Sequence, residues 1–353
     1  MNKLIDKVSE LNKPLLFILT LLILLLIGFL DLITGVEASI SIFYLIPIGI
    51  SSWFINEWMG LFISLFSSIV FYLADLLGSP SYRHPLTPYW NALVMLGTFI
   101  LFSSLLSELK KVMEKENIMA LQTQKSLLPK NDPEVNGYSI LSIWQPAKAV
   151  SGDGYDFIPF NENELGISLA DTCGHGYPAA LLMSNLQASF RIIADSRHRS
   201  PEMVCNGLNK IITSYEIDNK FISFFYGILD TKNKTFVYSN AGHPPPILLR
   251  SNGDILYLSR GGLLFGVNSE ASYELDKVHL EKGDRIFLFT DGIIETRNSA
   301  GEEFGEGRLI ELLKECFSLP IINFRERVLE TINQFGNGNI ADDITLLVLS
   351  VNN

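Results

Sequence analysis

Aspartates recur where predicted strands end or turns begin in the second half of the sequence. Asp153 lies in SGDGYDF, Asp171 closes LGISLAD, Asp291 follows IFLFT, and Asp342 and Asp343 precede ITLLVL. Carboxylates delivered to one edge of a sheet form an all-oxygen site, which suits hard divalent cations such as Mn²⁺ or Mg²⁺. Two adjacent ions would suit phosphate-ester hydrolysis by an activated water. For any single aspartate, a simple turn role is the commoner explanation.

Composition narrows the classes of partner and compartment. The 353 residues carry a net charge of −11, which gives no basic surface for nucleic acid, so we expect no nucleic-acid partner. Cys173, Cys205 and Cys316 are an odd number of widely spaced cysteines. They form no C-x-x-C pair and no zinc-like spacing with histidine, which favours a reducing compartment over a disulfide framework.

The elements that must position the aspartates follow from local patterns. Strands are predicted where β-branched and aromatic residues gather between turn residues, at YSILSIW, LGISLA, FFYGIL, KTFVYSN, DRIFLFT and ITLLVLSV. Helices are predicted at residues 177–194, 201–214, 306–317 and 323–335. Because strands and helices come in blocks, we expect an α+β layered sandwich, with central β-sheets flanked by helices.

The first 107 residues have a different character. Uncharged, mostly apolar runs cover residues 14–30, 38–56, 58–74 and 85–107. Runs of about 17–25 apolar residues can cross a bilayer as helices, so we expect a transmembrane region of four helices at 1–107. The first run lacks the small-residue cleavage site of a signal peptide and is expected to be retained. The region resembles four-helix sensory modules found before bacterial signalling output domains.

Lysines flank the apolar runs on the side that we place in the cytoplasm, because positively charged loops tend to stay there. They are Lys3, Lys7 and Lys13 before the first run and Lys110, Lys111 and Lys115 after the last. Arg83, beside His84 in an outer loop, is the one discordant charge. We predict a multi-pass protein of the bacterial inner (cytoplasmic) membrane, with both termini cytoplasmic.

Residues 108–130 are predicted to form a helical linker, since they are rich in helix formers and contain no glycine or proline before Pro129. The apolar positions Leu105, Leu109, Val112 and Met119 approach a coiled-coil spacing, although Glu116 interrupts it. Two interpretations stay open, namely a spacer helix lying on its own domain and a dimeric signalling helix in a homodimer.

From about residue 120 to residue 350, motifs occur in the order of a known family. They are ALQTQKSLLP, PAKAVSGDGYDF, LADTCGHGYPAALLMSNLQ, FFYGILD, NAGHPPPILL, GGLLFGV, GDRIFLFTDGIIETRNSAGEEFG and ADDITLLVL. These segments resemble the stage II sporulation protein E-like serine phosphatases, a branch of the PPM metal-dependent phosphatases. The resemblance implies a PPM-type phosphatase domain at 131–353.

The resemblance also implies roles for individual residues. Asp171 would bridge two ions, Mn²⁺ or Mg²⁺, beside the backbone carbonyl of Thr172. Asp291 and Asp342 would complete the set of ligands around one ion, and Asp153 would bind an ion or its waters. The wider class often has Glu immediately before the position of Asp153, where this chain has Gly152. The second ion is therefore expected to bind more weakly or to keep more of its water here.

Four further residues are candidates for a place at the site. Lys148 precedes Asp153 by five residues, where the wider class holds a phosphate-binding Arg, so it is a candidate phosphate anchor with a solvated loop lysine as the alternative. His175 lies two residues beyond the family's acid position, where this chain has Cys173, so we expect a turn role for it. We expect Cys173 to be a buried, inert thiol and His243, in NAGHPPP, to be architectural.

The predicted function is hydrolysis of phosphoserine or phosphothreonine on a signalling partner. The family's substrates are commonly STAS-type anti-sigma factor antagonists, so the resemblance implies this class of phosphoprotein. The alternative is a catalytically silent membrane receptor that uses the domain only to bind a partner.

Overall fold

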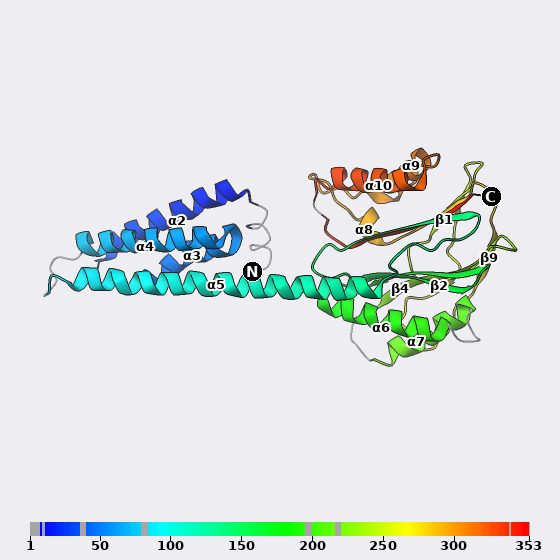
Figure 1. Cartoon of the computed structure of the whole chain (residues 1–353), viewed down its shortest axis with the longest axis horizontal. Coiled ribbons are helices and arrows are strands. Elements are labelled where there is room, and N and C mark those ends of the chain that lie inside the picture. The colour runs from blue at the N-terminus through cyan, green and yellow to red at the C-terminus, as the bar shows by residue number, and fades with distance from the viewer. Residues whose placement is uncertain are drawn as a thin grey trace. The chain divides into compact units, whose positions relative to one another are not determined.

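The computed structural model describes residues 8, 11–35, 40–78, 84–194, 200–215, 220–338 and 340–352, with the backbone alone at 322. The chain divides into two compact units, Met1–Glu116 and Asn117–Asn353. Figure 1 shows helices in the first unit and sheets covered by helices in the second. Lys3, Lys7 and Arg83, used above to predict orientation, lie outside the described residues.

Three helices of the first unit are long and apolar enough to cross a membrane, namely α2 (Lys13–Thr34), α4 (Glu57–Gly78) and α5 (Thr87–Leu127). The remaining expected span, the run at 38–56, is a shorter apolar segment over Ser41–Ile55. It consists of η2 (Ser41–Tyr44), α3 (Leu45–Ile50) and the π-helical η3 (Ser51–Ile55). Pro47 suits the first turn of α3, because its missing amide proton would have no partner there.

The core of the first unit is apolar and partly aromatic, with Leu24, Tyr44, Ile48, Ile63 and Phe99 buried against one another. The outer faces of its helices are equally apolar and exposed, including Leu22, Phe29 and Leu77. A helix that is hydrophobic all round is typical of a membrane span.

Contacts between its helices identify the two ends of this helical unit. At one end, Lys110 Nζ donates to the carbonyl of Trp53 at 2.6 Å, and Lys111 Nζ lies 2.8 Å from a Glu57 carboxylate oxygen. At the other end, a β-carbon on Gly35 would lie 3.1 Å from the carbonyl of Gly78, so α2 and α4 end side by side. The segment Ser41–Ile55 therefore ends beside the start of α4 and beside Lys110.

Two sheets form the centre of the second unit. The first has strand order β1-β11-β10-β6-β7, and the second has order β2-β3-β4-β5-β8, with β9 paired to β5. Nearly all pairings are antiparallel. The strands are β1 (Tyr138–Gln145), β2 (Asp153–Asn161), β3 (Glu164–Thr172), β4 (Ile222–Asp230), β5 (Thr235–Ala241), β6 (Ile247–Leu249), β7 (Ile255–Tyr257), β8 (Gly261–Gly262), β9 (Asp276–His279), β10 (Arg285–Phe289) and β11 (Ile344–Val351).

Helices cover the outer face of each sheet, and Figure 1 shows the resulting layers. The first sheet packs on α9 (Gly305–Glu315) and α10 (Ile321–Phe335), with Phe287 stacked on Phe324. The second sheet packs on α6 (Tyr177–Ala194) and α7 (Pro201–Thr213), with Phe190 against Tyr226. Side chains such as Leu169 and Leu347 fill the space between the sheets. The predicted layered α+β sandwich is confirmed.

Most of the predicted linker, residues 108–127, lies in α5, which ends at Leu127, and the role of this segment as a linker stays a prediction. The last turns of α5, from Asn117 on, belong to the second unit. Gln124 makes two hydrogen bonds with the backbone of Ser151, and Arg191 donates to the Leu127 carbonyl at 2.9 Å. The end of α5 is therefore tied to the loop that precedes β2. The seam positions Leu105, Leu109, Val112 and Met119 are each more than half exposed in the single chain.

Candidate active site

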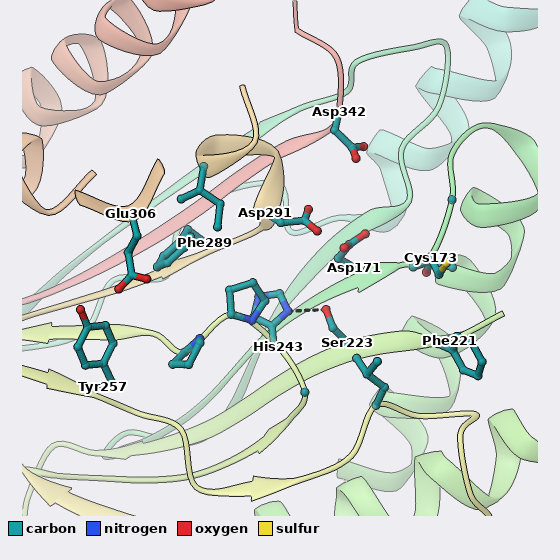
Figure 2. Close-up of a pocket in the computed structure, with 17 residues that line it drawn as sticks. Asp171, Cys173, Phe221, Ser223, His243, Tyr257, Phe289, Asp291, Glu306 and Asp342 are labelled. Carbon is teal, nitrogen blue, oxygen red and sulfur yellow. Dashed lines mark hydrogen bonds between the residues drawn. The ribbon is translucent and has the colours of Figure 1, made fainter. Parts of the chain in front are cut away.

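A cavity of about 680 Å³ opens where the two sheets meet at one end of the sandwich (Figure 2). The second sheet contributes Asp171, Thr172 and Ser223 to its wall. The first sheet contributes Phe289, and Asp291 follows it at the start of the short helix α8 (Asp291–Ile294). Residues that are far apart in sequence are thus brought to one place by the packing of the two sheets.

Three of the predicted aspartates face this cavity. Asp171 lies near the end of β3, Asp291 begins α8, and Asp342 lies two residues before β11. Burial, followed by the charges of Asp291 and Asp342, raises the pKa of Asp171 to about 7. Burial, followed by Glu295 and Asp342, raises the pKa of Asp291 to about 6. Each carboxylate therefore meets like charges, and a cation at this point would relieve their repulsion.

The cavity wall has an unbalanced charge. Its ionised side chains are carboxylates, and no lysine or arginine of the described residues lines it. Within the described part of the chain, no three His, Cys, Asp or Glu side chains lie close enough to hold an ion by themselves. The donor set therefore fits an ion that keeps part of its water shell, as Mg²⁺ commonly does.

Asp153 lies directly behind this wall. It begins β2 opposite Asp171 in the β2–β3 register, and its side chain is buried. Its Oδ2 atom accepts hydrogen bonds from Thr290 Oγ1 at 2.7 Å and Thr345 Oγ1 at 2.6 Å. Burial and the Asp171 charge raise its pKa well above the usual range. Thr345 of β11 and Thr290, directly after β10, thus hold this carboxylate of the second sheet from the first sheet.

Asp343 has a structural role. Its two carboxylate oxygens accept hydrogen bonds from the backbone amides of Ala147 and Gly152, both at 2.7 Å. A β-carbon on Gly152 would lie 3.2 Å from the carbonyl oxygens of Thr172 and Gly174. The backbone before Asp153 is therefore held tightly, with little room for a side chain at position 152.

Lys148 lies in this tightly held loop but does not line the cavity. Its Nζ atom is 3.2 Å from Nδ1 of His175, and both side chains are exposed. His175 sits between Gly174 and Gly176, whose φ angles of 92° and 78° favour glycine, as a tight turn requires. The turn expected at His175 is confirmed, and the phosphate-anchor role of Lys148 stays a prediction.

His243 lines the cavity from the turn after β5. Burial lowers its pKa to about 3, so the ring is neutral at physiological pH. Its Nδ1 atom lies 2.7 Å from Ser223 Oγ, and its backbone is held on both sides by the Asn240 amide. Nε2 is buried without an ordinary hydrogen bond, although the Phe289 carbonyl faces the ring. His243 is thus architectural, as expected, and it also orients a cavity hydroxyl.

Residues 161–352 match the model of the family described as stage II sporulation protein E (SpoIIE). The chain belongs to the SpoIIE family. It is 29% identical over 242 residues to the phosphoserine phosphatase RsbU of Bacillus subtilis, covering 68% of this chain and 71% of RsbU. It is 28% identical over 259 residues to protein IcfG of Synechocystis sp., covering 65% of this chain and 40% of IcfG.

A solved structure shares the fold of this SpoIIE-family chain. The SiaA-PP2C domain of Pseudomonas aeruginosa superposes with a TM-score of 0.61 at 20% identity, covering 68% of this chain and 98% of that domain. The two sheets and their flanking helices are therefore the PP2C arrangement.

Cys173 corrects one expectation for this SpoIIE-family site. Its thiol is exposed and lines the cavity, whereas we expected a buried thiol. The turn that carries it is held by its backbone, because its amide donates to the Phe221 carbonyl at 2.8 Å and its carbonyl accepts from Lys220 Nζ at 3.0 Å. Both backbone groups are bonded, and the side chain is left facing solvent.

Sequence reasoning missed the hydroxyl residues Ser223, Thr290 and Thr345. Each interrupts or ends an apolar strand, and this interruption was the only available signal. Their partners come from sheet register and packing, since Ser223 lies opposite Asp171 and both threonines reach Asp153 from the other sheet.

Proposed function

We propose that this chain is a membrane-anchored, metal-dependent protein phosphatase that hydrolyses phosphoserine or phosphothreonine on a signalling partner. The observation that carries the proposal is the cavity where Asp171, Asp291 and Asp342 meet without a neighbouring lysine or arginine among the described residues. Membership of the SpoIIE family and the likeness to a phosphoserine phosphatase support it.

In this proposal the aspartates hold Mn²⁺ or Mg²⁺. Asp171 would hold both ions, with the Thr172 carbonyl as a ligand beside it. Asp291 and Asp342 would complete the ligands of one ion, and Asp153 would hold an ion or its waters. Bound ions would lower the pKa of an attacking water and balance the charge of the phosphate. The few protein ligands within reach are consistent with ions that remain partly hydrated.

The protein's own groups would do the remaining work. Asp153, fixed by the two threonine hydroxyls, would keep Asp171 in place across the β2–β3 pair. Ser223, fixed by neutral His243, would present its oxygen to water or substrate in the cavity. Lys148 would approach a bound phosphate as a point charge from the rim of the site.

The membrane half of the proposal is a four-segment region in the bacterial inner membrane, with the phosphatase domain and both termini cytoplasmic. Three long apolar helices support anchoring. The segment Ser41–Ile55 would be the fourth crossing, because it ends beside Lys110 at the end that the positive-inside rule places in the cytoplasm. A homodimer joined along α5 would let this region influence the phosphatase.

The proposed partner is a phosphorylated STAS-type anti-sigma factor antagonist, the substrate class that the family resemblance implies. The alternative, a silent receptor that only binds such a partner, is disfavoured because all four aspartates are present, with Asp171, Asp291 and Asp342 lining one cavity and Asp153 directly behind its wall. A silent domain has no need for these unpaired charges.

The test is hydrolysis of an aryl phosphate and a phosphoserine peptide by the detergent-purified full chain, with and without Mn²⁺. Asp171→Asn should lower kcat/KM at least about a hundredfold, because even indirect partners of metal ligands cost about 10–100-fold. Asp254→Asn, an exposed β6–β7 turn residue, is the matched control and should change little. A folded chain without Mn²⁺-dependent hydrolysis, or an unaffected Asp171→Asn variant, would leave the silent receptor.

A further inference from the structure

The cavity extends past the aspartates to a second group of side chains. Pro244 and Pro245 follow His243 in the turn after β5, Tyr257 ends β7, and Glu306 lies in the first turn of α9. Figure 2 shows Tyr257 and Glu306 together on the side of the cavity away from Asp171 and Cys173. The aspartates occupy only part of the cavity, so a ligand that fills it must also contact this second group.

Glu306 forms no ion pair within the described part of the chain. The nearest arginines in sequence are directed elsewhere, since Arg308 donates to the carbonyls of Glu303 and Phe304 and Arg297 pairs with the Glu303 carboxylate. The neighbour of Glu306 in the cavity is Tyr257, and hydrogen bonding to the Glu306 carboxylate raises the pKa of that hydroxyl. The Glu306 carboxylate therefore lies beside the Tyr257 phenol in the cavity and meets no counter-charge among the described residues.

We propose that Tyr257 and Glu306 form a subsite for a lysine or arginine side chain that flanks the phosphorylated residue of the substrate. The inference rests on the proposed phosphatase function and adds a preference among phosphoproteins. Pro244, Pro245 and the Tyr257 ring supply an apolar wall for the aliphatic part of such a side chain. The Glu306 carboxylate supplies the negative charge that pairs with the positively charged end of that lysine or arginine.

Electrostatics favours this ligand over the alternatives. The phosphate must lie at the aspartate end, where bound cations would balance it. At the other end no described lysine or arginine is available, so an acidic flanking residue would meet Glu306 as a like charge and be rejected. A basic flanking residue would be attracted, and a neutral one would gain only the apolar contacts.

The expected preference is modest, because Glu306 is exposed. Exposed ion pairs contribute about 0.2–1 kcal/mol, which corresponds to a preference of up to roughly fivefold in kcat/KM. We therefore expect a phosphoserine peptide with one lysine to be hydrolysed about two- to fivefold better than its alanine counterpart. The same peptide with glutamate in that place should be hydrolysed more slowly.

The experiment uses the full chain in detergent with Mn²⁺. The substrates are alanine-based phosphoserine peptides with a single lysine or glutamate at each of the three positions on either side, together with an aryl phosphate that has no flanking residue. Glu306→Gln should abolish the lysine preference, and Glu306→Lys should reverse it in favour of glutamate. Tyr257→Phe should weaken it. Glu311→Lys, the same charge change on an exposed site of α9, should leave it intact.

The aryl phosphate separates the two levels of the proposal. If the wild type hydrolyses neither it nor any peptide, the phosphatase function itself fails. If aryl phosphate is hydrolysed but no position shows a lysine preference, or Glu306→Lys leaves that preference unchanged, the subsite is refuted. A loss of aryl phosphate hydrolysis or of Mn²⁺ binding in Glu306→Gln would also refute it, because Glu306 would then serve the metals or the fold.

Discussion

Gln124 joins the end of α5 to the loop that precedes β2. Its Nε2 atom donates to the Ser151 carbonyl at 2.7 Å, and the Ser151 amide donates to its Oε1 atom at 2.9 Å. Both residues are buried, and Asp153 follows two residues later. Gln124→Ala would leave two buried backbone groups unpaired, at about 1–3 kcal/mol each. Allowing for water that enters the vacated space, we expect local opening of residues 147–153 to become easier by about 2–4 kcal/mol.

Hydrogen–deuterium exchange of the full chain measures this change directly. An easier opening by 2 kcal/mol corresponds to a roughly 30-fold faster exchange, so peptides covering residues 147–157 should exchange at least that much faster in Gln124→Ala. Mn²⁺ affinity should fall with it, because Asp153 would no longer be held in position. Gln122→Ala, an exposed glutamine of the same helix, is the matched control. Unchanged protection in Gln124→Ala would show that α5 does not hold this loop, and the reasoning would be wrong.

Three other outcomes follow from single contacts. Thr345→Val removes the 2.6 Å hydrogen bond to Asp153 at nearly constant volume, so Mn²⁺ affinity measured by calorimetry should fall about 10–100-fold. Iodoacetamide at pH 8 should label exposed Cys173 at least about a hundredfold faster than Cys205, whose pKa burial raises to about 12. Because the folded-state pKa of His243, about 3, lies below its unfolded value of 6.5, acid should destabilise the fold by about 1.4 kcal/mol per pH unit between those values. The wild-type thermal midpoint should fall more steeply below pH 6 than that of His243→Asn.

Each of these three predictions would be contradicted by a specific result. A Thr345→Val protein that binds Mn²⁺ like the wild type would mean that Asp153 needs no hydroxyl support. Equal labelling of Cys173 and Cys205 by mass spectrometry would contradict the difference in burial. Parallel pH profiles of the wild type and His243→Asn would show that the ring is protonated in the folded protein.

Segments whose own pattern matches their environment were predicted well. ITLLVLSV is buried on both faces as β11, and the amphipathic helices α6, α7, α9 and α10 begin within two residues of their predicted starts. In contrast, β2 was missed because DGYDFIPFN contains glycine, proline and acidic residues that disfavour a strand locally. Its pairing with β3 overrides that preference, and local patterns do not contain this information.

The residues of the site could likewise be predicted only where a local sequence pattern marks them. Asp171, Asp291 and Asp342, which the structure brings to one cavity, could be singled out because each lies at an end of an apolar strand. The supporting hydroxyls could not, because Thr290 and Thr345 meet Asp153 only when one sheet packs on the other. The exposure of Cys173 was predicted wrongly for a related reason. Proximity to buried motifs in sequence does not show on which side of a turn a side chain lies.

The place of β11 has a consequence for the order in which the protein is made. β11 lies inside the first sheet, between β1 and β10, yet it follows every other strand of the chain. A ribosome adding about 5–20 residues per second needs roughly 10–40 s to travel from the end of β1 to β11. Until then β1 lacks its strand partner and Asp342 has not been synthesised, whereas β2 to β5 pair with strands nearby in sequence. A nascent chain would thus pair β2 to β5 first and acquire the full set of aspartates only when the last strand follows, so the proposed metal site could not form on an unfinished domain.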